Sequence, residues 1–215
     1  MSKTAARPPS RPLALITGAS GGIGEAFAKI LAAEKYDLLL VARSDAKLKA
    51  LATALKTGAG VSVEVLAADL QNPKGIDAVS AALKRLGRIP NTLVNNAGFG
   101  QVGPFAASDE KNQIGMLRLN IEALTRLTHL VLPGMLRRKS GVILNVASTA
   151  SFQPGPGMAV YCASKAYVLS FSEAIAHELR DSGVTVTALC PGATRTGFEK
   201  AAGMGKTDLF RGKIP

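Results

Sequence analysis

Tyr161 and Lys165 are four residues apart in a stretch with helical periodicity, so their side chains lie on one face of a helix. A carbonyl that accepts a hydride needs a proton at its oxygen, and the reverse reaction needs a base. A lysine ammonium roughly 4 Å away supplies about 4 kcal/mol, enough to lower a tyrosine pKa from about 10 to about 7. The pair therefore predicts an acid/base centre in which Lys165 depresses the pKa of Tyr161. The alternative is a structural pair, because Tyr and Lys at this spacing are common on amphipathic helices.

Two further polar residues fit such a centre. Ser148 ends a predicted strand thirteen residues before Tyr161, and its hydroxyl can donate to a substrate oxygen that gains negative charge. Asn120 lies in a long predicted helix, and its amide could order a water that links Lys165 to solvent. Ser151 is a neighbouring hydroxyl that could be mistaken for Ser148. We expect Ser148, Tyr161, Lys165 and Asn120 to form the catalytic set.

A glycine-rich turn, TGASGGIG at residues 17–24, follows the first apolar run and opens the first helical pattern. Glycines let the backbone approach a pyrophosphate, and a helix N-terminus presents N–H groups and a positive dipole to it. The spacing is neither G-x-G-x-x-G nor that of a P-loop. The turn predicts a dinucleotide site, with a merely tight connection as the alternative. The expected contacts in this turn are Gly18, Ser20, Gly21, Gly22, Ile23 and Gly24.

The end of the second predicted strand, Val41-Ala42-Arg43-Ser44, carries an arginine and no acid. A carboxylate at this place commonly binds the ribose 2′-hydroxyl of a dinucleotide, whereas a guanidinium suits a 2′-phosphate. Asp45 is close by, but we interpret it as a helix cap. Arg43 therefore favours NADP(H), with NAD(H) still possible. A merely solvated arginine is the alternative.

An alternation of strand and helix patterns must position these residues. Short apolar runs predict strands at residues 13–17, 36–42, 61–67, 92–95, 141–147 and 184–190. Helical spacing of apolar residues predicts helices at residues 22–35, 45–56, 73–86, 110–132 and 160–181. The alternation predicts an α/β fold, a three-layer doubly wound parallel sheet (Rossmann fold) with strand order 3-2-1-4-5-6. Ligands of such sheets bind beyond the carboxyl ends of the strands.

The composition is that of a globular protein, with 215 residues, of which 47% are hydrophobic and 19% charged. We expect a disordered basic arm over residues 1–12 and a single Rossmann-type catalytic domain over residues 13–215. No apolar run approaches the roughly 18 residues of a membrane span, and no secretory leader is evident. Nothing in their spacing pairs Cys162 with Cys190. We expect a cytoplasmic protein without a stable membrane anchor.

The formal net charge is +11, from 26 basic and 15 acidic residues, which raises nucleic-acid binding as an alternative function. The basic residues are dispersed, however, apart from one short cluster at residues 137–139. No zinc-ligand set or aromatic RNA-binding signature accompanies them. We therefore expect a solvated basic surface and no nucleic-acid partner. No group of residues has metal-ligand spacing, so we expect no metal.

Taken in order, these motifs resemble those of the short-chain dehydrogenase/reductase family, over residues 13 to about 200. They are TGASGGIG at 17–24, Asp69 after the third strand, NNAG at 95–98, Asn120, Ser148, YCASK with Tyr161 and Lys165, and Pro191-Gly192. Members usually continue into another helix and a seventh strand. Because this chain ends at Pro215, we expect six strands.

The resemblance also implies the remaining cofactor contacts. Asp69 is expected at the adenine edge, and the turn that contains Asn95 and Gly98 along the ribose side. Pro191 and Gly192, followed by threonines, are expected at the nicotinamide carboxamide. The full set implied beyond the glycine turn and Arg43 is Asp69, Leu70, Asn95, Ala97, Gly98, Tyr161, Lys165, Pro191, Gly192, Thr194 and Thr196.

The function that the resemblance implies is an NAD(P)-dependent oxidoreductase acting on CH–OH groups, with Tyr161 as acid/base. We expect an NADPH-dependent reductase of ketones, aldehydes or 3-oxoacyl groups, or the reverse alcohol dehydrogenase. Residues 151–158 and the tail after Gly192 are expected to shape the substrate pocket. Aromatic and methionine side chains near the site favour an apolar substrate: Phe99, Phe152, Met158 and Phe198.

The helices at 110–132 and 160–181 carry apolar residues on more than one face, which calls for a second partner besides the sheet. The resemblance implies that these helices pair across a two-fold axis, in a homodimer or homotetramer. A different class of function, a dinucleotide-binding sensor or scaffold without turnover, is the alternative to an enzyme.

Overall fold

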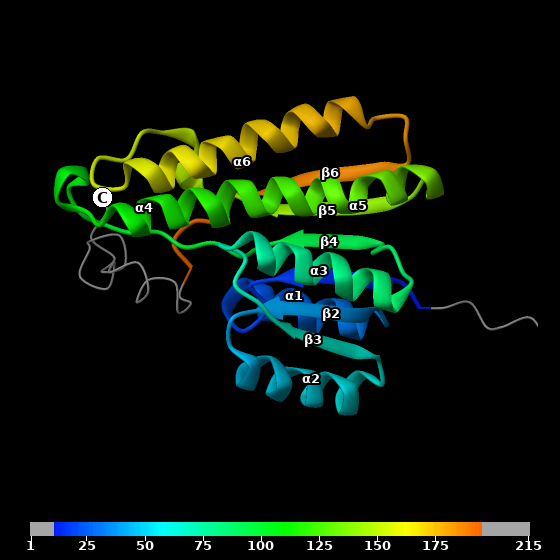
Figure 1. Cartoon of the computed structure of the whole chain (residues 1–215). Helices are drawn as coiled ribbons and strands as arrows, with labels where there is room; N and C mark the ends of the chain where they lie inside the picture. The colour runs from blue at the N-terminus through cyan, green and yellow to red at the C-terminus, as the bar shows by residue number, and fades with distance from the viewer. Residues whose placement is uncertain (1–10, 195–215) are drawn as a thin grey trace, which may run out of the picture.

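The apolar runs of the sequence form one parallel sheet in the computed structural model, which describes residues 11–194 (Figure 1). Its six strands lie in the order β3-β2-β1-β4-β5-β6, as expected, and this is the order of a Rossmann-like fold. Every neighbouring pair is parallel, so all carboxyl ends meet at one edge of the sheet. The strands are β1 (Leu13–Thr17), β2 (Asp37–Ala42), β3 (Val63–Ala67), β4 (Thr92–Asn95), β5 (Gly141–Val146) and β6 (Val184–Leu189).

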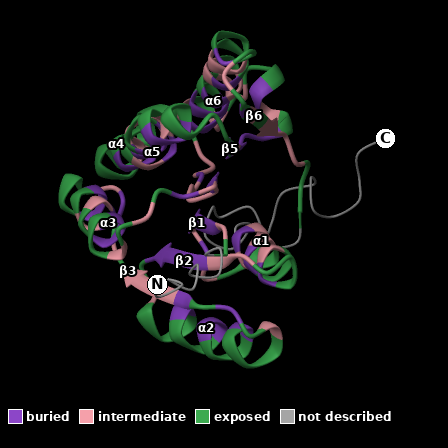
Figure 2. Cartoon of the chain, turned by 90° about the vertical axis from the view of Figure 1, so that its right-hand side faces the viewer, coloured by how far each residue is buried: buried purple, intermediate pink, exposed green. Residues whose placement is uncertain are grey.

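Helices cover both faces of the sheet, because successive residues of each buried strand point to opposite faces. In β1, Leu13 and Leu15 join the cluster under α3 and α5, whereas Ala14 and Ile16 join the cluster under α1 and α2. In Figure 2 the central strands are coloured largely as buried, and the surrounding helices carry both buried and exposed segments. The helices are α1 (Gly22–Ala33), α2 (Asp45–Ala59), α3 (Pro73–Leu86), α4 (Glu110–Leu117), α5 (Leu124–Arg138) and α6 (Ala159–Glu178).

The single long helix expected at residues 110–132 is in fact three segments. A π-helical turn, η2 (Arg118–Ala123), joins α4 to α5. The helix also continues past the expected end, through Pro133 to Arg138. Proline removes the hydrogen bond to the carbonyl of His129, but His129 and Pro133 are both exposed, so water can satisfy that carbonyl.

The expected cap at Asp45 is wrong. Ser44 is the N-cap residue of α2, and Asp45 is the first helical residue, with its carboxylate 2.7 Å from the ammonium of Lys49. A carboxylate in the first turn still interacts favourably with the positive end of the helix dipole. In the part of the chain that the structure describes, no helix is both long and apolar enough to cross a membrane.

Candidate active site

The four expected catalytic residues come from three elements that meet at the carboxyl edge of β4 and β5. Ser148 follows β5 and caps a short 3-10 helix, η3 (Thr149–Phe152). Tyr161 and Lys165 lie in the first turns of α6, and Asn120 lies in η2. All four side chains are buried, with exposed fractions of 9% or less. The fold therefore brings this set together from positions up to 45 residues apart in sequence.

Lys165 is enclosed by the protein, and its Nζ donates a 2.7 Å hydrogen bond to the carbonyl oxygen of Val146. Burial lowers the pKa of Lys165 to about 8, with the nearby Cys190 opposing that fall. Gly98 packs closely beside it. A Cβ on Gly98 would lie 3.5 Å from Nζ and 3.0 Å from Oδ1 of Asn120.

The pKa of Tyr161 moves in the direction opposite to the sequence expectation. Burial raises the pKa of Tyr161, while a hydrogen bond with the Ser148 side chain lowers it and Cys162 raises it further. The Lys165 ammonium lies 5.9 Å from the centre of the tyrosine ring and is bonded to the carbonyl of Val146. Tyr161 is accordingly protonated at neutral pH, the state of a proton donor.

The structure separates Ser148 from its neighbour Ser151. Ser148 is the hydroxyl that is hydrogen-bonded to Tyr161, and its Oγ also accepts from the backbone N–H of Ala150 at 3.1 Å. Ser151 instead donates to the backbone carbonyl of Lys165 at 2.9 Å, which fastens η3 to α6. The structure thus places Ser148, and not Ser151, in hydrogen-bond contact with the side chain of Tyr161.

Asn120 uses both ends of its amide on the protein. Its Nδ2 donates to the carbonyl of Phe99 at 3.0 Å, and its Oδ1 accepts from the Phe99 N–H at 3.1 Å. The same Nδ2 bonds Oγ of Ser164 at 3.0 Å, and Ser164 donates to the carbonyl of Tyr161 at 2.7 Å. These bonds hold the loop after β4 against α6. The ordered water expected at Asn120 stays a prediction.

The glycine turn after β1 packs closely against the start of α1. Gly18 has a φ of 65°, and a Cβ on Gly24 would lie 2.4 Å from the Gly18 carbonyl oxygen, so the turn packs directly on α1. Gly21 caps α1 without a side-chain hydrogen bond. No side chain at Gly21 therefore caps the first N–H groups of α1, so these groups can bind an anion, and the residues present fit a dinucleotide.

A pair of residues that sequence reasoning left unassigned ties this turn to β4. Asn96 donates from Nδ2 to the carbonyls of Thr17 and Gly18, at 3.0 and 3.2 Å. The hydroxyl of Thr17 accepts from the backbone of Asn96 and Ala97, each at 3.0 Å. The signal was present, since Asn96 is the second residue of NNAG and Thr17 opens TGASGGIG.

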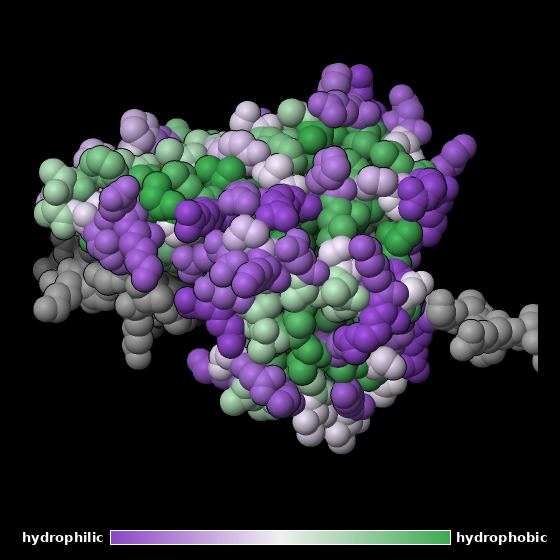
Figure 3. Space-filling model, in the orientation of Figure 1, coloured by the Kyte–Doolittle hydropathy of each residue, from purple (hydrophilic) through white to green (hydrophobic). Residues whose placement is uncertain are grey.

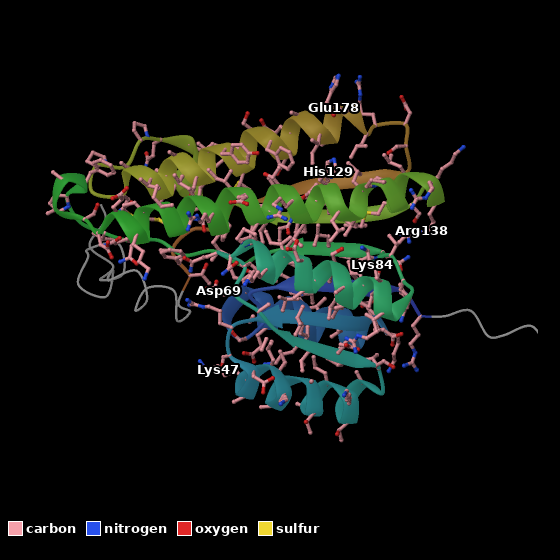
Figure 4. All side chains as sticks on the ribbon, viewed as in Figure 1. Lys47, Asp69, Lys84, His129, Arg138 and Glu178 are labelled. Carbon is pink, nitrogen blue, oxygen red and sulfur yellow. The ribbon has the colours of Figure 1, made fainter. Side chains whose placement is uncertain are left out.

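Arg43 follows β2 at the same edge, beside the glycine turn, because the N–H of Ala19 bonds the carbonyl of Val41 at 3.3 Å. Its side chain is exposed and, among residues 11–194, makes no hydrogen bond or ion pair. Asp69 lies past the neighbouring strand β3, and Figure 4 shows it at the end of the molecule opposite Lys84 and Arg138. Its Oδ1 accepts from the N–H of Gln71 at 3.0 Å.

The remaining expected cofactor residues are spread over this edge. Asn95 is buried: its Nδ2 donates to Oγ1 of Thr128 and to Oδ1 of Asn145, each at 3.0 Å, and its Oδ1 is buried without a hydrogen-bond partner among the described residues. Pro191 accepts from the N–H of Thr149 at 3.0 Å, which joins the loop after β6 to η3. Thr194 is exposed and bonds the Gly192 carbonyl. Thr196 and Phe198 lie outside the described residues.

Lys165→Met is expected to raise the free energy of unfolding at pH 7 by about 1–3 kcal/mol while abolishing activity. A fall in the Lys165 pKa from 10.5 to about 8 corresponds to about 3 kcal/mol of destabilisation below pH 8, offset by about 1 kcal/mol for the lost bond to Val146. Between pH 8 and 10.5, Lys165 is protonated in the unfolded chain but neutral in the folded one. The free energy of unfolding of the parent therefore rises with pH across that window. Denaturant unfolding at pH 7 and pH 10 measures the difference in the free energy of unfolding between the variant and the parent, which should be smaller at pH 10. A variant that is less stable than the parent at pH 7 would contradict this account.

Comparison with known proteins gives one consistent family. A family model described as short chain dehydrogenase matches residues 12–206. A short-chain dehydrogenase from Sphingobium yanoikuyae, solved in complex with NADPH, is 41% identical, with a TM-score of 0.87 over 95% of this chain and 77% of that chain. The bulky-bulky ketone specific alcohol dehydrogenase from Comamonas testosteroni is 38% identical, with a TM-score of 0.82 over 86% of this chain and 73% of that one.

A curated relative is the very-long-chain 3-oxoacyl-CoA reductase of Phaeosphaeria nodorum, 41% identical over 179 residues. The match covers 80% of this chain and 52% of that protein, and the chain spans about half the length of several of the curated relatives it matches. The chain belongs to the short-chain dehydrogenase/reductase family.

Proposed function

We propose that this chain is an NADPH-dependent carbonyl reductase in which Tyr161 donates the proton. One observation carries the proposal: the hydroxyls of Ser148 and Tyr161 are hydrogen-bonded to each other beside a buried lysine, at the edge where the glycine turn ends β1. NADPH, when bound, supplies a hydride from its nicotinamide to the carbonyl carbon. Ser148 then donates to the carbonyl oxygen, and Tyr161 transfers its proton to that oxygen as the alcohol forms.

The environment of Tyr161 suits the proton donor of a reduction. Burial raises its pKa, so the hydroxyl is protonated at neutral pH and can donate to a carbonyl oxygen. Alcohol oxidation, which needs the deprotonated group, should therefore rise with pH above neutrality. Lys165, still largely charged at pH 7, would return a proton toward Tyr161 and hold the ribose hydroxyls.

The cofactor would lie along the carboxyl edge of the strands. The N–H groups at the start of α1 and the turn around Gly18 would hold the pyrophosphate, and Arg43 the 2′-phosphate. Asp69 and Leu70 would meet the adenine, Ala97 and Gly98 the ribose, and the loop from Pro191 the carboxamide. The relative from S. yanoikuyae was solved in complex with NADPH, which supports this choice of cofactor.

The proposal is tested by NADPH oxidation with a panel of ketones, aldehydes and 3-oxoacyl thioesters. We expect turnover with at least one class and formation of the matching alcohol. Tight binding of NADPH without oxidation by any carbonyl would contradict the proposal and would instead favour a sensor or scaffold.

A second copy of the chain is expected to pair through α4, α5 and α6. Figure 3 shows hydrophobic residues gathered on the surface over these helices. Exposed apolar residues there are Ile114 (38%), Leu117 (37%), Leu130 (36%) and Tyr167 (36%). Light scattering at micromolar concentration should give a dimer or tetramer, and Leu117→Glu should shift it toward monomer; a monomeric parent would contradict this prediction.

A further inference from the structure

The turn between β3 and α3 packs closely on the start of the helix that follows it. Oδ1 of Asp69 accepts from the N–H of Gln71 at 3.0 Å, and Asn72 caps α3 with its side chain. In the first turn of α3, a Cβ on Gly75 would collide with the carbonyl oxygen of Asp69. We name residues 69–72 the β3 turn. It carries the two residues that are proposed to meet the adenine.

The side chain of Gln71 reaches from the β3 turn to α4. Gly115 is buried in α4, and a Cβ there would collide with Oε1 of Gln71 and would lie 3.5 Å from Cζ of Phe99. Among the residues that the structure describes, the Gln71 amide makes no hydrogen bond, so it meets α4 by packing. Glycine weakens a helix relative to alanine, and a glycine inside a helix often admits the close approach of another group. Gly115 thus gives Gln71 its room.

Leu70, the neighbouring residue, points the same turn toward η2. Its side chain is 4% exposed and belongs to the apolar cluster that contains Ala123, with Leu119 packed against that cluster. The three side chains line one small cavity. Two consecutive residues of the β3 turn therefore pack toward the helical segment that runs from α4 into η2.

Of the two partners in the contact, α4 is the better anchored. Gly115 is buried, whereas Gln71 is half-buried and the β3 turn is otherwise largely exposed. The ring of Phe99 lies beside Gly115, and the Phe99 backbone is hydrogen-bonded to both ends of the Asn120 amide, at 3.0 and 3.1 Å. An atom added between the two elements therefore displaces Gln71 and the β3 turn rather than α4.

We propose that Gln71 is a positioning residue for the adenosine half of NADPH: its contact with Gly115 holds the β3 turn at the distance from α4 that the bound adenine requires. This inference rests on the proposed function and adds a residue that acts without touching the cofactor. The nicotinamide half, proposed to lie at Tyr161 and Lys165, does not depend on this contact. Affinity for the adenosine half should therefore respond to changes at the contact, whereas the chemistry at the nicotinamide should not.

The first test is Gly115→Ala, which should raise the Kd for NADPH about tenfold, because the added methyl group forces Gln71 and the β3 turn away from α4. Adenosine 2′,5′-bisphosphate, which is the adenosine half alone, should lose affinity by the same factor. The kcat at saturating NADPH should keep the value of the parent. Reduced nicotinamide mononucleotide, which lacks the adenosine half, should keep its kcat/KM as hydride donor. Calorimetric titration measures the two affinities, and steady-state kinetics with one ketone measure the rest.

A double-mutant cycle isolates the contact itself. Gln71→Ala alone should raise both Kd values about threefold, because the β3 turn loses its packing on α4. Gln71→Ala/Gly115→Ala should bind no more weakly than Gln71→Ala, since the methyl group then fills space that the shorter side chain leaves free. Additive effects, with a double variant about thirtyfold weaker than the parent, would overturn the inference.

The matched control is Gly58→Ala in α2, another glycine inside a helix, where a Cβ would meet no described atom within 4 Å. It should leave both affinities unchanged. If Gly115→Ala does not fold, Gln71→Ala decides the matter, and an unchanged Kd for adenosine 2′,5′-bisphosphate would overturn the inference. An equal loss of activity with reduced nicotinamide mononucleotide in Gly115→Ala would also overturn it.

Binding of the adenosine half separates this inference from the proposed function. The expected pattern of affinities in a protein that oxidises NADPH with no carbonyl would contradict the proposed function and support the inference. Turnover in the parent, with affinities that ignore both substitutions, would overturn the inference alone.

Discussion

Tyr161→Phe is expected to lower kcat for carbonyl reduction by about 10²- to 10⁴-fold, the contribution of general acid catalysis. The ring keeps its place in the cluster with Met116 and Cys162, and only the hydroxyl that bonds Ser148 is removed. The Kd for NADPH should therefore change little. Steady-state kinetics on the best carbonyl substrate and a fluorescence titration of NADPH measure the two quantities.

Tyr36→Phe is the matched control, because Tyr36 is half-buried just before β2, at the opposite edge of the sheet. It should keep the kcat of the parent. If Tyr161→Phe retained more than about a tenth of kcat, the acid would have to be another group. A parallel loss of NADPH binding would indicate a damaged fold instead.

Arg43→Ala is expected to erase most of a preference for NADPH over NADH of roughly 10- to 150-fold. A charge-assisted hydrogen bond to a phosphate is worth about 1.5–3 kcal/mol, and 1.4 kcal/mol is tenfold. Because the exposed guanidinium makes no hydrogen bond or ion pair among residues 11–194, it can turn to the 2′-phosphate without breaking a contact. The variant should raise KM for NADPH with little change for NADH.

An acid at the same strand end should reverse the preference, since it would accept from the free ribose hydroxyl and repel the phosphate. Ala42→Asp does so at a position that is 8% exposed, so Arg43→Asp is the safer companion. Lys56→Ala, at the far end of α2, is the control cation. A parent that prefers NADH in paired kcat/KM measurements would show the interpretation of Arg43 to be wrong and would make Asp45 the next candidate.

The strand order was predictable because the pattern itself carries it. Strands alternate with helices, and right-handed crossovers restrict the topology. Burial on both faces makes the central strands β1 and β2 nearly continuous apolar runs. Helix α3 and strand β4 have the expected ends, where Asn72 caps the helix with its side chain and Pro73 opens it. Turn chemistry marks such boundaries in the sequence.

The π-helical turn at Arg118–Ala123 was not predictable, because apolar residues continue across it at helical spacing. In the structure, the turn places the amide of Asn120 in contact with Phe99, in the loop after β4, and with Ser164 on α6. The pKa direction of Tyr161 failed for a related reason. Spacing on a helix gives the neighbour, but the depth of burial, which dominates the shift, depends on the whole fold.

Transfer of deuterium to a ketone substrate from NADPH in which both hydrogens at C4 of the nicotinamide are deuterium tests the central claim most directly. Mass spectrometry should find one deuterium on the carbinol carbon of the alcohol with the parent, and no labelled alcohol above background with Tyr161→Phe. Unlabelled alcohol, or no alcohol from any carbonyl of the panel despite bound NADPH, would contradict the claim that this chain transfers hydride to a carbonyl.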